Sequence, residues 1–184
     1  MLLKCPIGRA GGDLPKPLVI LGSARRSGET RRAVDIAFPA GSIDLATLCD
    51  HQISGYDYTH LNADDDFQFV VDLMLAANTI VIATPVYWYA MSGLMKMFFD
   101  RLTDLLETSK EKGRMMAGKE LWMIASGTER ILPEGFEVPV ARTAQYFNIG
   151  YRGAEYLYTG DNPEIRQHSE AALANFGQRV LASH

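Results

Sequence analysis

Residues 79–84 read TIVIAT, and this stretch decides the fold of the chain. It is β-branched and apolar on both of its faces. Such a segment is typical of a central strand in a parallel sheet, because helices cover both faces of that kind of sheet. The flanking sequence supports this interpretation, since short apolar runs alternate with stretches whose apolar residues keep helical spacing.

Five strand–helix repeats are predicted along the chain. The strands fall at residues 18–21, 42–48, 79–84, 120–125 and 151–158, and a helical stretch follows each of them. Pro39 ends the first helix, and Asn162 with Pro163 begins the last. Parallel strands with helical crossovers predict a doubly wound α/β sandwich of three layers. Ligands of such folds bind beyond the carboxyl ends of the strands, which here lie near Leu21, Thr84 and Ala125.

Composition narrows the class of protein. The chain has 184 residues, of which 47% are apolar and 22% charged, as expected for one globular domain. No apolar run approaches the roughly 18 residues that span a bilayer, so no membrane partner is expected. A net charge of −4 argues against a nucleic-acid partner, and the presence of only Cys5 and Cys49 indicates a reducing, cytoplasmic location. Residues 1–16 lack the apolar core of a secretory signal and are expected to form an arm ahead of a domain over residues 17–184.

The first loop at a predicted strand end reads GSARRSGET, residues 22–30. Its hydroxyl groups, its flexible Gly28 and the free N–H groups of the helix start suit a bound anion such as a phosphate. Arg25 or Arg26 would add a charge-assisted hydrogen bond. The spacing matches neither a Walker A loop nor a GxGxxG motif. The alternative is a polar loop with an ordinary helix cap.

Two further loops end neighbouring strands. Residues 85–93 read PVYWYAMSG, and three adjacent aromatic side chains cannot all be buried because they point in different directions. An aromatic cluster beside a crevice suits a flat, conjugated ligand, although Tyr87 and Trp88 could equally lie in the core or in a subunit interface. Residues 126–130 read SGTER, and the small residues let backbone N–H groups approach a ligand, or form a simple turn.

At these loops the sequence resembles the NADPH-dependent FMN reductase family. The first loop of that family typically reads G-S-P-R-x-x-G-N-T, which residues 22–30 follow. Residues 84–102, TPVYWYAMSGLMKMFFDRL, are similar to its second motif, S-P-V-Y-W-x-x-M-S-x-x-x-K-x-F-x-D-R. The second match is long and specific, and the resemblance extends over residues 17–180.

The resemblance implies a flavodoxin-like fold, in which a five-stranded parallel sheet has the order 2-1-3-4-5, and a non-covalent FMN. It also implies that the FMN phosphate is held by Ser23, Arg25, Ser27, Gly28, Glu29 and Thr30. The isoalloxazine and ribityl side would be lined by Pro85, Val86, Tyr87 and Trp88. The other edge of the ring would be bounded by Ser126, Gly127 and Thr128.

The function implied is that of a flavoenzyme that passes hydride from NADPH or NADH through bound flavin to a quinone, a flavin or a similar small-molecule acceptor. The flavin carries the chemistry, so no catalytic side chain is assigned. Relatives often form dimers or tetramers, and the aromatic loop and its methionines are expected to leave apolar surface near the flavin, which predicts a homodimer or homotetramer. Met91, Met95 and Met97 are expected to be packing or interface residues. The alternatives are a flavodoxin-type electron carrier without nicotinamide chemistry and a scaffold that has lost its flavin.

The sequence departs from the family pattern at two positions. Ala24 replaces a proline, and Glu29 replaces an asparagine, so the Glu29 side chain is expected to face water. Some relatives carry an iron–sulfur cluster after the second strand, but Cys49 alone cannot hold one.

Other polar residues are expected to have structural roles. His51 and His60 are expected in a solvated loop rather than at a metal, and Asp64 to Asp66 are expected to cap a helix. The pairs Lys96–Asp100 and Arg101–Asp104 are expected to form along the wet side of a helix.

Overall fold

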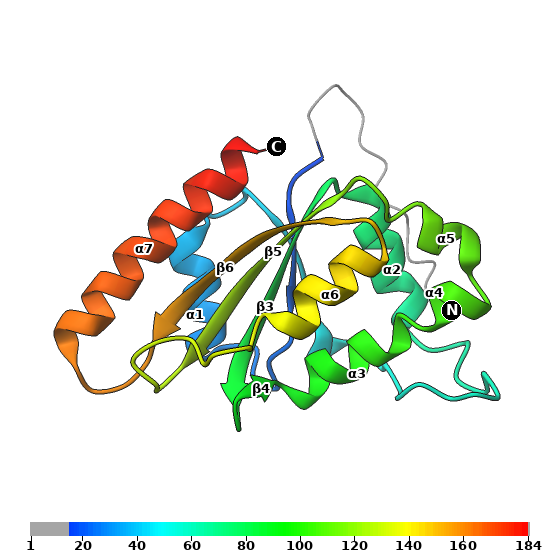
Figure 1. Cartoon of the computed structure of the whole chain (residues 1–184), viewed down its shortest axis with the longest axis horizontal. Helices are drawn as coiled ribbons and strands as arrows, with labels where there is room; N and C mark the ends of the chain where they lie inside the picture. Colours follow the sequence, from blue (N-terminus) through cyan, green and yellow to red (C-terminus); the bar gives the residue numbers. More distant parts are fainter. Residues whose placement is uncertain (1–14, 184) are drawn as a thin grey trace.

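A computed structural model describes residues 15–183, and a six-stranded sheet runs through its centre (Figure 1). Five parallel strands lie in the order β2-β1-β3-β5-β6: β1 (Leu18–Leu21), β2 (Asp44–Thr47), β3 (Thr79–Tyr87), β5 (Glu120–Gly127) and β6 (Gly150–Tyr158). The sixth, β4 (Ala90–Met91), pairs antiparallel with the end of β3. Counted without β4, the order is 2-1-3-4-5, which confirms the predicted flavodoxin-like topology.

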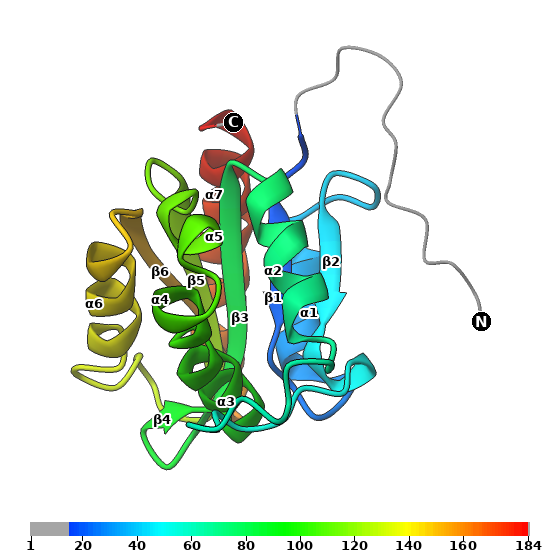
Figure 2. The ribbon, with the colours of Figure 1, turned by 90° about the vertical axis from the view of Figure 1, so that its right-hand side faces the viewer.

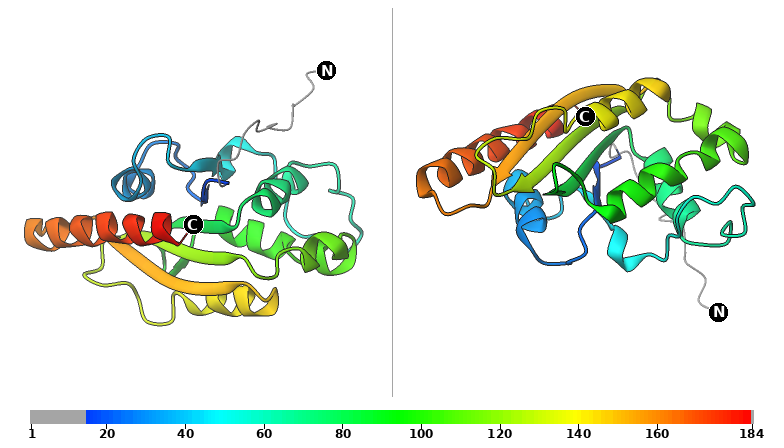
Figure 3. Two further views of the ribbon diagram at one scale, coloured as in Figure 1. Left: turned by 90° about the horizontal axis from the view of Figure 1, so that it is seen from above. Right: turned by 60° about the horizontal axis from the view of Figure 1, so that its bottom comes forward.

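The helices form two layers, one on each face of the sheet (Figures 2 and 3). One layer contains α1 (Glu29–Ala37) and α7 (Pro163–Ala182), and its core joins Val34 and Phe176 to Val81 of the sheet. The other contains α2 (Phe67–Ala76), α3 (Gly93–Arg101) and α6 (Val138–Tyr146), and its core joins Phe98 to Ile82. Because β3 lies between both cores, residues 79–85 are buried, as TIVIAT predicts.

Several short elements were not predicted. They are β4, the 3-10 helix η1 (Leu48–Asp50), α4 (Asp104–Glu107) and α5 (Lys110–Arg114). The cap of α7 is confirmed, because Asn162 Oδ1 accepts hydrogen bonds from the N–H groups of Glu164 and Ile165 at 3.0 and 3.1 Å. Within the described part of the chain, no helix is both long enough and apolar enough to cross a membrane. The predicted arm, residues 1–16, lies almost wholly outside the described residues.

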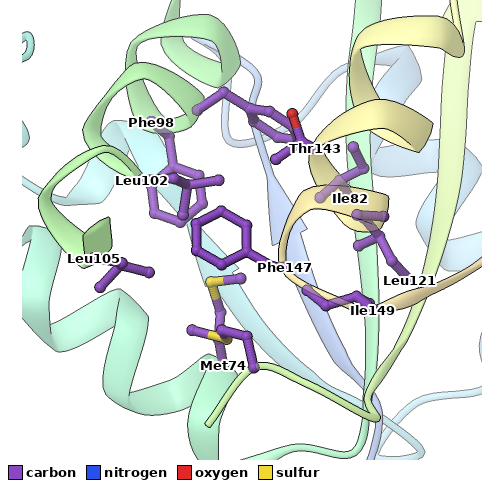
Figure 4. Close-up of a pocket in the computed structure, with 12 residues that line it drawn as sticks. Met74, Ile82, Phe98, Leu102, Leu105, Leu121, Thr143, Phe147 and Ile149 are labelled. Carbon is purple, nitrogen blue, oxygen red and sulfur yellow. The ribbon is translucent and has the colours of Figure 1, made fainter. Parts of the chain in front are cut away.

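The two helical layers differ in how tightly they pack. On the α1/α7 side, a methyl group added at Gly177 would lie 1.7 Å from the carbonyl oxygen of Ala37, so the two helices touch through their backbones. On the other side, a cavity of about 20 Å³ remains between α3, α6 and the sheet, and Phe98, Phe147 and Leu121 point into it (Figure 4). Its lining is apolar apart from Thr143.

Arg101 corrects a prediction. The pair Lys96–Asp100 forms on the exposed side of α3, as expected. Arg101 also pairs with Asp104, Nε to Oδ2 at 2.8 Å, but its side chain is fully buried rather than on the wet side. The guanidinium also pairs with Asp65 and stacks over the Phe67 ring, 4.6 Å from its centroid. Burial by itself lowers the pKa of Arg101, yet hydrogen bonds to the two carboxylates raise it above its usual value overall.

The loop that precedes α2 confirms one expectation and corrects another. The cap expected from Asp64 to Asp66 is present, because Asp65 Oδ1 accepts a hydrogen bond from Phe67 N at 2.9 Å, although Asp66 at the N-cap position makes no side-chain cap. The loop is, however, not fully solvated. His51 and His60 have side chains only 15% and 30% exposed, and His60 Nδ1 lies 3.6 Å from Asp104 Oδ1. The buried Arg101 thus pairs with Asp65 and Asp104, and His60 lies beside Asp104, although the sequence suggests separate surface residues.

Candidate functional site

The three predicted loops meet at the carboxyl edge of the sheet, which is the lower edge in Figure 1 and is turned forward in the right panel of Figure 3. Thr30 Oγ1 of the first loop lies 2.8 Å from Ser126 Oγ of the third, and both side chains are buried. Pro85 of the second loop pairs in register with Ser126. The sheet therefore brings residues about 40 to 100 positions apart into one site, as the strand order requires.

The first loop ends in a helix that no side chain caps. Gly28 holds the N-cap position in an extended conformation and makes no side-chain cap, so N–H groups of the first turn of α1 face the loop. Ser23 is buried, and its Oγ accepts a hydrogen bond from Arg25 N at 3.2 Å, while Ser27 is exposed. These groups would surround an anion with donors and the positive end of the helix dipole.

Charged residues of the first loop divide into two groups. The guanidinium of Arg26 pairs with Asp50, whereas Arg25 is exposed and has no ion-pair partner among residues 15–183. Glu29 Oε2 lies 3.4 Å from Arg32 Nη1 one turn along α1, so the carboxylate is held on the exposed helix surface. Arg25 is therefore the arginine that remains free to meet an anion, and Glu29 is turned to its own helix, as expected.

The second loop is a tight hairpin between β3 and β4. Tyr87 pairs with Ala90, and the two residues between them, Trp88 and Tyr89, have φ angles of +49° and +63°. Two consecutive left-handed residues form the type I′ turn that joins antiparallel strands and that normally takes Asn-Gly. Trp88 is 94% exposed and gains no burial from this conformation. A strained turn with large exposed rings beside a site indicates a functional role.

Replacing Trp88 and Tyr89 together with Asn and Gly is expected to stabilise the fold. Each positive φ angle costs of order 1 kcal/mol for a large side chain, so the double variant should gain about 2 kcal/mol and raise Tm by roughly 4–8 °C. Thermal unfolding without added flavin measures the change. The control is Tyr87→Asn, which alters an exposed neighbour without a positive φ and should give no gain. A double variant no more stable than the parent would contradict the strain argument.

Two methionines of this segment are packing residues, which is one of the two roles expected of them. Met91 is 9% exposed and Met95 is fully buried, so neither adds to the apolar surface at the site. Met95 instead packs against Gly22, where an added methyl group would lie 2.7 Å from its Cε. The exposed apolar surface of the hairpin comes from its three aromatic rings.

The third loop is supported from behind by β6. Gly127 is half-buried, and an added methyl group there would lie 2.8 Å from the Tyr156 hydroxyl and 3.1 Å from Val86 Cβ. Tyr156 donates a hydrogen bond to the carbonyl oxygen of Glu129 at 3.1 Å, and burial with the nearby Glu129 raises its pKa to about 12. Tyr156 therefore stays protonated and holds the loop in place, while Thr128 remains exposed.

Three residues of the site were missed by the sequence analysis. Thr84 Oγ1 accepts a hydrogen bond from Ser92 N at 3.0 Å, and Ser92 Oγ in turn donates to the carbonyl oxygen of Gly22. These bonds tie the hairpin to the first loop. Ser92 also caps α3 by accepting a hydrogen bond from Met95 N, and its position directly before an apolar helical stretch could have revealed it. Tyr156 has no comparable signal. No group of three or more metal-ligating side chains with suitable geometry occurs in residues 15–183.

The strand order and the place of the three loops define a flavodoxin-like protein. Residues 15–132 match the model of the family described as NADPH-dependent FMN reductase, and since this is more than half of the chain, the chain belongs to that family. The donors found here fit the cofactor of that family, because an uncapped helix start and an unpaired arginine suit its phosphate.

Individual relatives support the assignment. The curated relative "Putative NAD(P)H-dependent FMN-containing oxidoreductase YwqN" of Bacillus subtilis is 32% identical over 117 residues, which are 60% of this chain and 64% of the relative, less than two thirds of its length. Among solved structures, the Trp repressor binding protein from Bacillus subtilis is similar with a TM-score of 0.69 at 20% identity, covering 87% of this chain and 96% of that one. An FMN-dependent NADH-azoreductase from Bacillus anthracis in complex with FMN gives 0.68 at 15% identity, covering 90% and 99%. Both structures share the fold.

Proposed function

We propose that the chain is an FMN-dependent oxidoreductase that takes hydride from NADPH or NADH and reduces a small-molecule acceptor such as a quinone or a flavin. One observation carries the proposal: in a member of this family, buried hydroxyl groups, an uncapped helix start and an exposed aromatic hairpin meet at one edge of the sheet. The scarcity of cysteine fits a cytoplasmic enzyme.

The proposed division of labour follows the three loops. The FMN phosphate would be held by Ser23, Arg25, Ser27, Thr30 and the backbone of Gly28 and Glu29, whose N–H groups belong to the start of α1. The hairpin, Pro85 to Trp88, would line the isoalloxazine and ribityl side, and Ser126 to Thr128 would bound the opposite edge of the ring.

The chemistry needs little from side chains. Bound FMN supplies a ring that accepts hydride and returns electrons to an acceptor. Over one cycle NADPH or NADH loses a hydride, and a quinone gains two electrons and two protons, one of them from solvent. Backbone N–H groups of the second and third loops would stabilise negative charge that develops on the ring. The loops also orient the ring, and Tyr156 fixes the third of them.

The test is an absorbance spectrum of the purified protein after FMN has been added and the excess removed, followed by anaerobic NADPH or NADH. Retained flavin bands that bleach support the proposal. Retained bands that neither nucleotide bleaches would favour a flavodoxin-type electron carrier. Failure to retain flavin at micromolar protein would contradict the assignment of the first loop.

We also propose a homodimer or homotetramer. Tyr87, Trp88 and Tyr89 of the hairpin are 56%, 94% and 66% exposed. Ile131, which directly follows the third loop, is 77% exposed. Exposed apolar groups gathered in this way are typical of interfaces or ligand sites. Light scattering at micromolar concentration should give a mass of at least two chains, and a monomer would contradict the prediction.

A further inference from the structure

A hollow of about 300 Å³ opens beside the proposed ring site, and the proposed mechanism does not use it. It is lined by Tyr89 from the hairpin and by Glu129, Ile131, Leu132, Pro133 and Glu134 from the segment after β5. Figure 1 shows both segments at the lower edge of the sheet. Its volume is at the lower end of the range for small-molecule sites.

The position of the hollow connects it to the ring site. Tyr89 directly follows Trp88, and Glu129 directly follows Thr128. Each of the two loops proposed to bound the ring therefore continues into one wall of the hollow. A flat molecule in the hollow would therefore lie next to the ring. The apolar side chains of Tyr89 and Ile131 are 66% and 77% exposed and gain burial when such a molecule covers them.

The far wall is fixed before any ligand arrives. The Glu129 carbonyl oxygen accepts the hydrogen bond from the Tyr156 hydroxyl at 3.1 Å. At the other end, Phe136 N donates to the Pro133 carbonyl oxygen at 3.1 Å, and Phe136 itself is buried. Both ends of the segment are thus anchored to the core, which keeps the two carboxylates near the hollow.

The charge of the lining is negative. Glu129 and Glu134 are exposed, and neither pairs with a basic side chain within the described part of the chain. Arg130 lies between them in the sequence but does not line the hollow. Two unpaired carboxylates beside apolar walls repel an anion and tolerate a neutral or cationic molecule.

We infer that this hollow is the acceptor subsite, and that Glu129 and Glu134 make it select flat acceptors that are neutral or cationic over acceptors that carry a sulfonate or carboxylate. The inference rests on the proposed function and deepens it, because it names the class of acceptor. Glu129 and Glu134 are specificity-determining residues and take no part in electron transfer.

The test compares 1,4-naphthoquinone with its 2-sulfonate, which share a ring system and differ in charge. Equilibrium dialysis against the flavin-free protein should give a dissociation constant about tenfold lower for the neutral compound. In the E129Q/E134Q double variant the preference should fall to about twofold. The matched control is E111Q/E164Q, which makes the same change in net charge at two exposed residues outside the hollow and should keep the parent preference.

A second readout separates this inference from the proposed function. FMN-loaded protein reduced by dithionite, without any nicotinamide, is reoxidised by each quinone in a stopped-flow apparatus. E129Q/E134Q should accelerate reoxidation by the sulfonate about fivefold and change reoxidation by the neutral quinone much less. An unchanged ratio in dialysis and in reoxidation, or an equal change in E111Q/E164Q, would overturn the inference. Failure of NADPH and NADH to reduce the flavin would instead contradict only the proposed function.

Discussion

Replacing Ser27 with aspartate is expected to weaken FMN binding about a hundredfold. Ser27 is exposed in the loop that opens α1, next to Gly28 and to the N–H groups of the uncapped first turn. A carboxylate there would lie within a few ångströms of the proposed phosphate position. Repulsion between it and a phosphate dianion is about 3 kcal/mol at a partly exposed site, which corresponds to a factor of about a hundred.

Flavin fluorescence titrations with FMN and with riboflavin measure this effect separately from folding. Riboflavin lacks the phosphate, so Ser27→Asp should leave its affinity within about twofold. Arg26→Ala is the matched control, because Arg26 is held by Asp50 and its loss should change FMN affinity little, whereas Arg25→Ala should weaken it by about tenfold. Equal losses for FMN and riboflavin would mean that the phosphate lies elsewhere.

Replacing Arg101 with methionine is expected to lower the free energy of unfolding by about 4 kcal/mol. The Arg101 side chain is fully buried, and its removal leaves the carboxylates of Asp65 and Asp104 without their counter-charge. These two side chains are only 10% and 6% exposed. Removing one partner of a buried ion pair typically costs 3–5 kcal/mol, because the remaining charge stays desolvated. Urea denaturation of the flavin-free protein measures the loss.

Two further variants decide whether buried charge is the cause. Lys96→Met removes the partner of Asp100 on the exposed side of the same helix and should cost less than about 1 kcal/mol. The triple variant R101M/D65N/D104N removes all three charges and should recover at least half of the lost free energy of unfolding. If R101M alone yields too little folded protein to titrate, the triple variant should still yield enough. Equal costs for Arg101→Met and Lys96→Met would contradict the explanation.

Much of the fold could be predicted because parallel strands leave a clear pattern. TIVIAT is buried on both faces, and such burial favours β-branched and apolar residues along the whole strand rather than at alternate positions. The three loops of the site could also be placed, since the carboxyl ends of β1, β3 and β5 share one edge. Their convergence is confirmed by the contact between Thr30 and Ser126 and by the pairing of Pro85 with Ser126. The part each residue plays toward FMN stays a prediction.

The features that escaped prediction depend on contacts across the chain. Arg101 and Asp104 have the same spacing as a surface pair, and only the position of Asp65, 36 residues earlier, shows that the pair is buried. The turn at Trp88 and Tyr89 contradicts local preference, because large side chains disfavour positive φ angles. The antiparallel pairing of β4 with β3, which joins Tyr87 to Ala90, imposes these φ angles on the two residues between them. Tyr156 supports the third loop from a strand whose sequence carries no sign of that role.

The cavity beside Phe147 affects the volume of the folded state. An apolar space of about 20 Å³ offers a water molecule too few hydrogen-bond partners, so it stays dry in the folded chain and disappears on unfolding. The unfolded chain with its water therefore occupies less volume, and hydrostatic pressure favours it. In the α1/α7 layer, by contrast, Gly177 meets Ala37 without room for a methyl group. We therefore expect compression to act on the layer of α3 and α6 through this cavity.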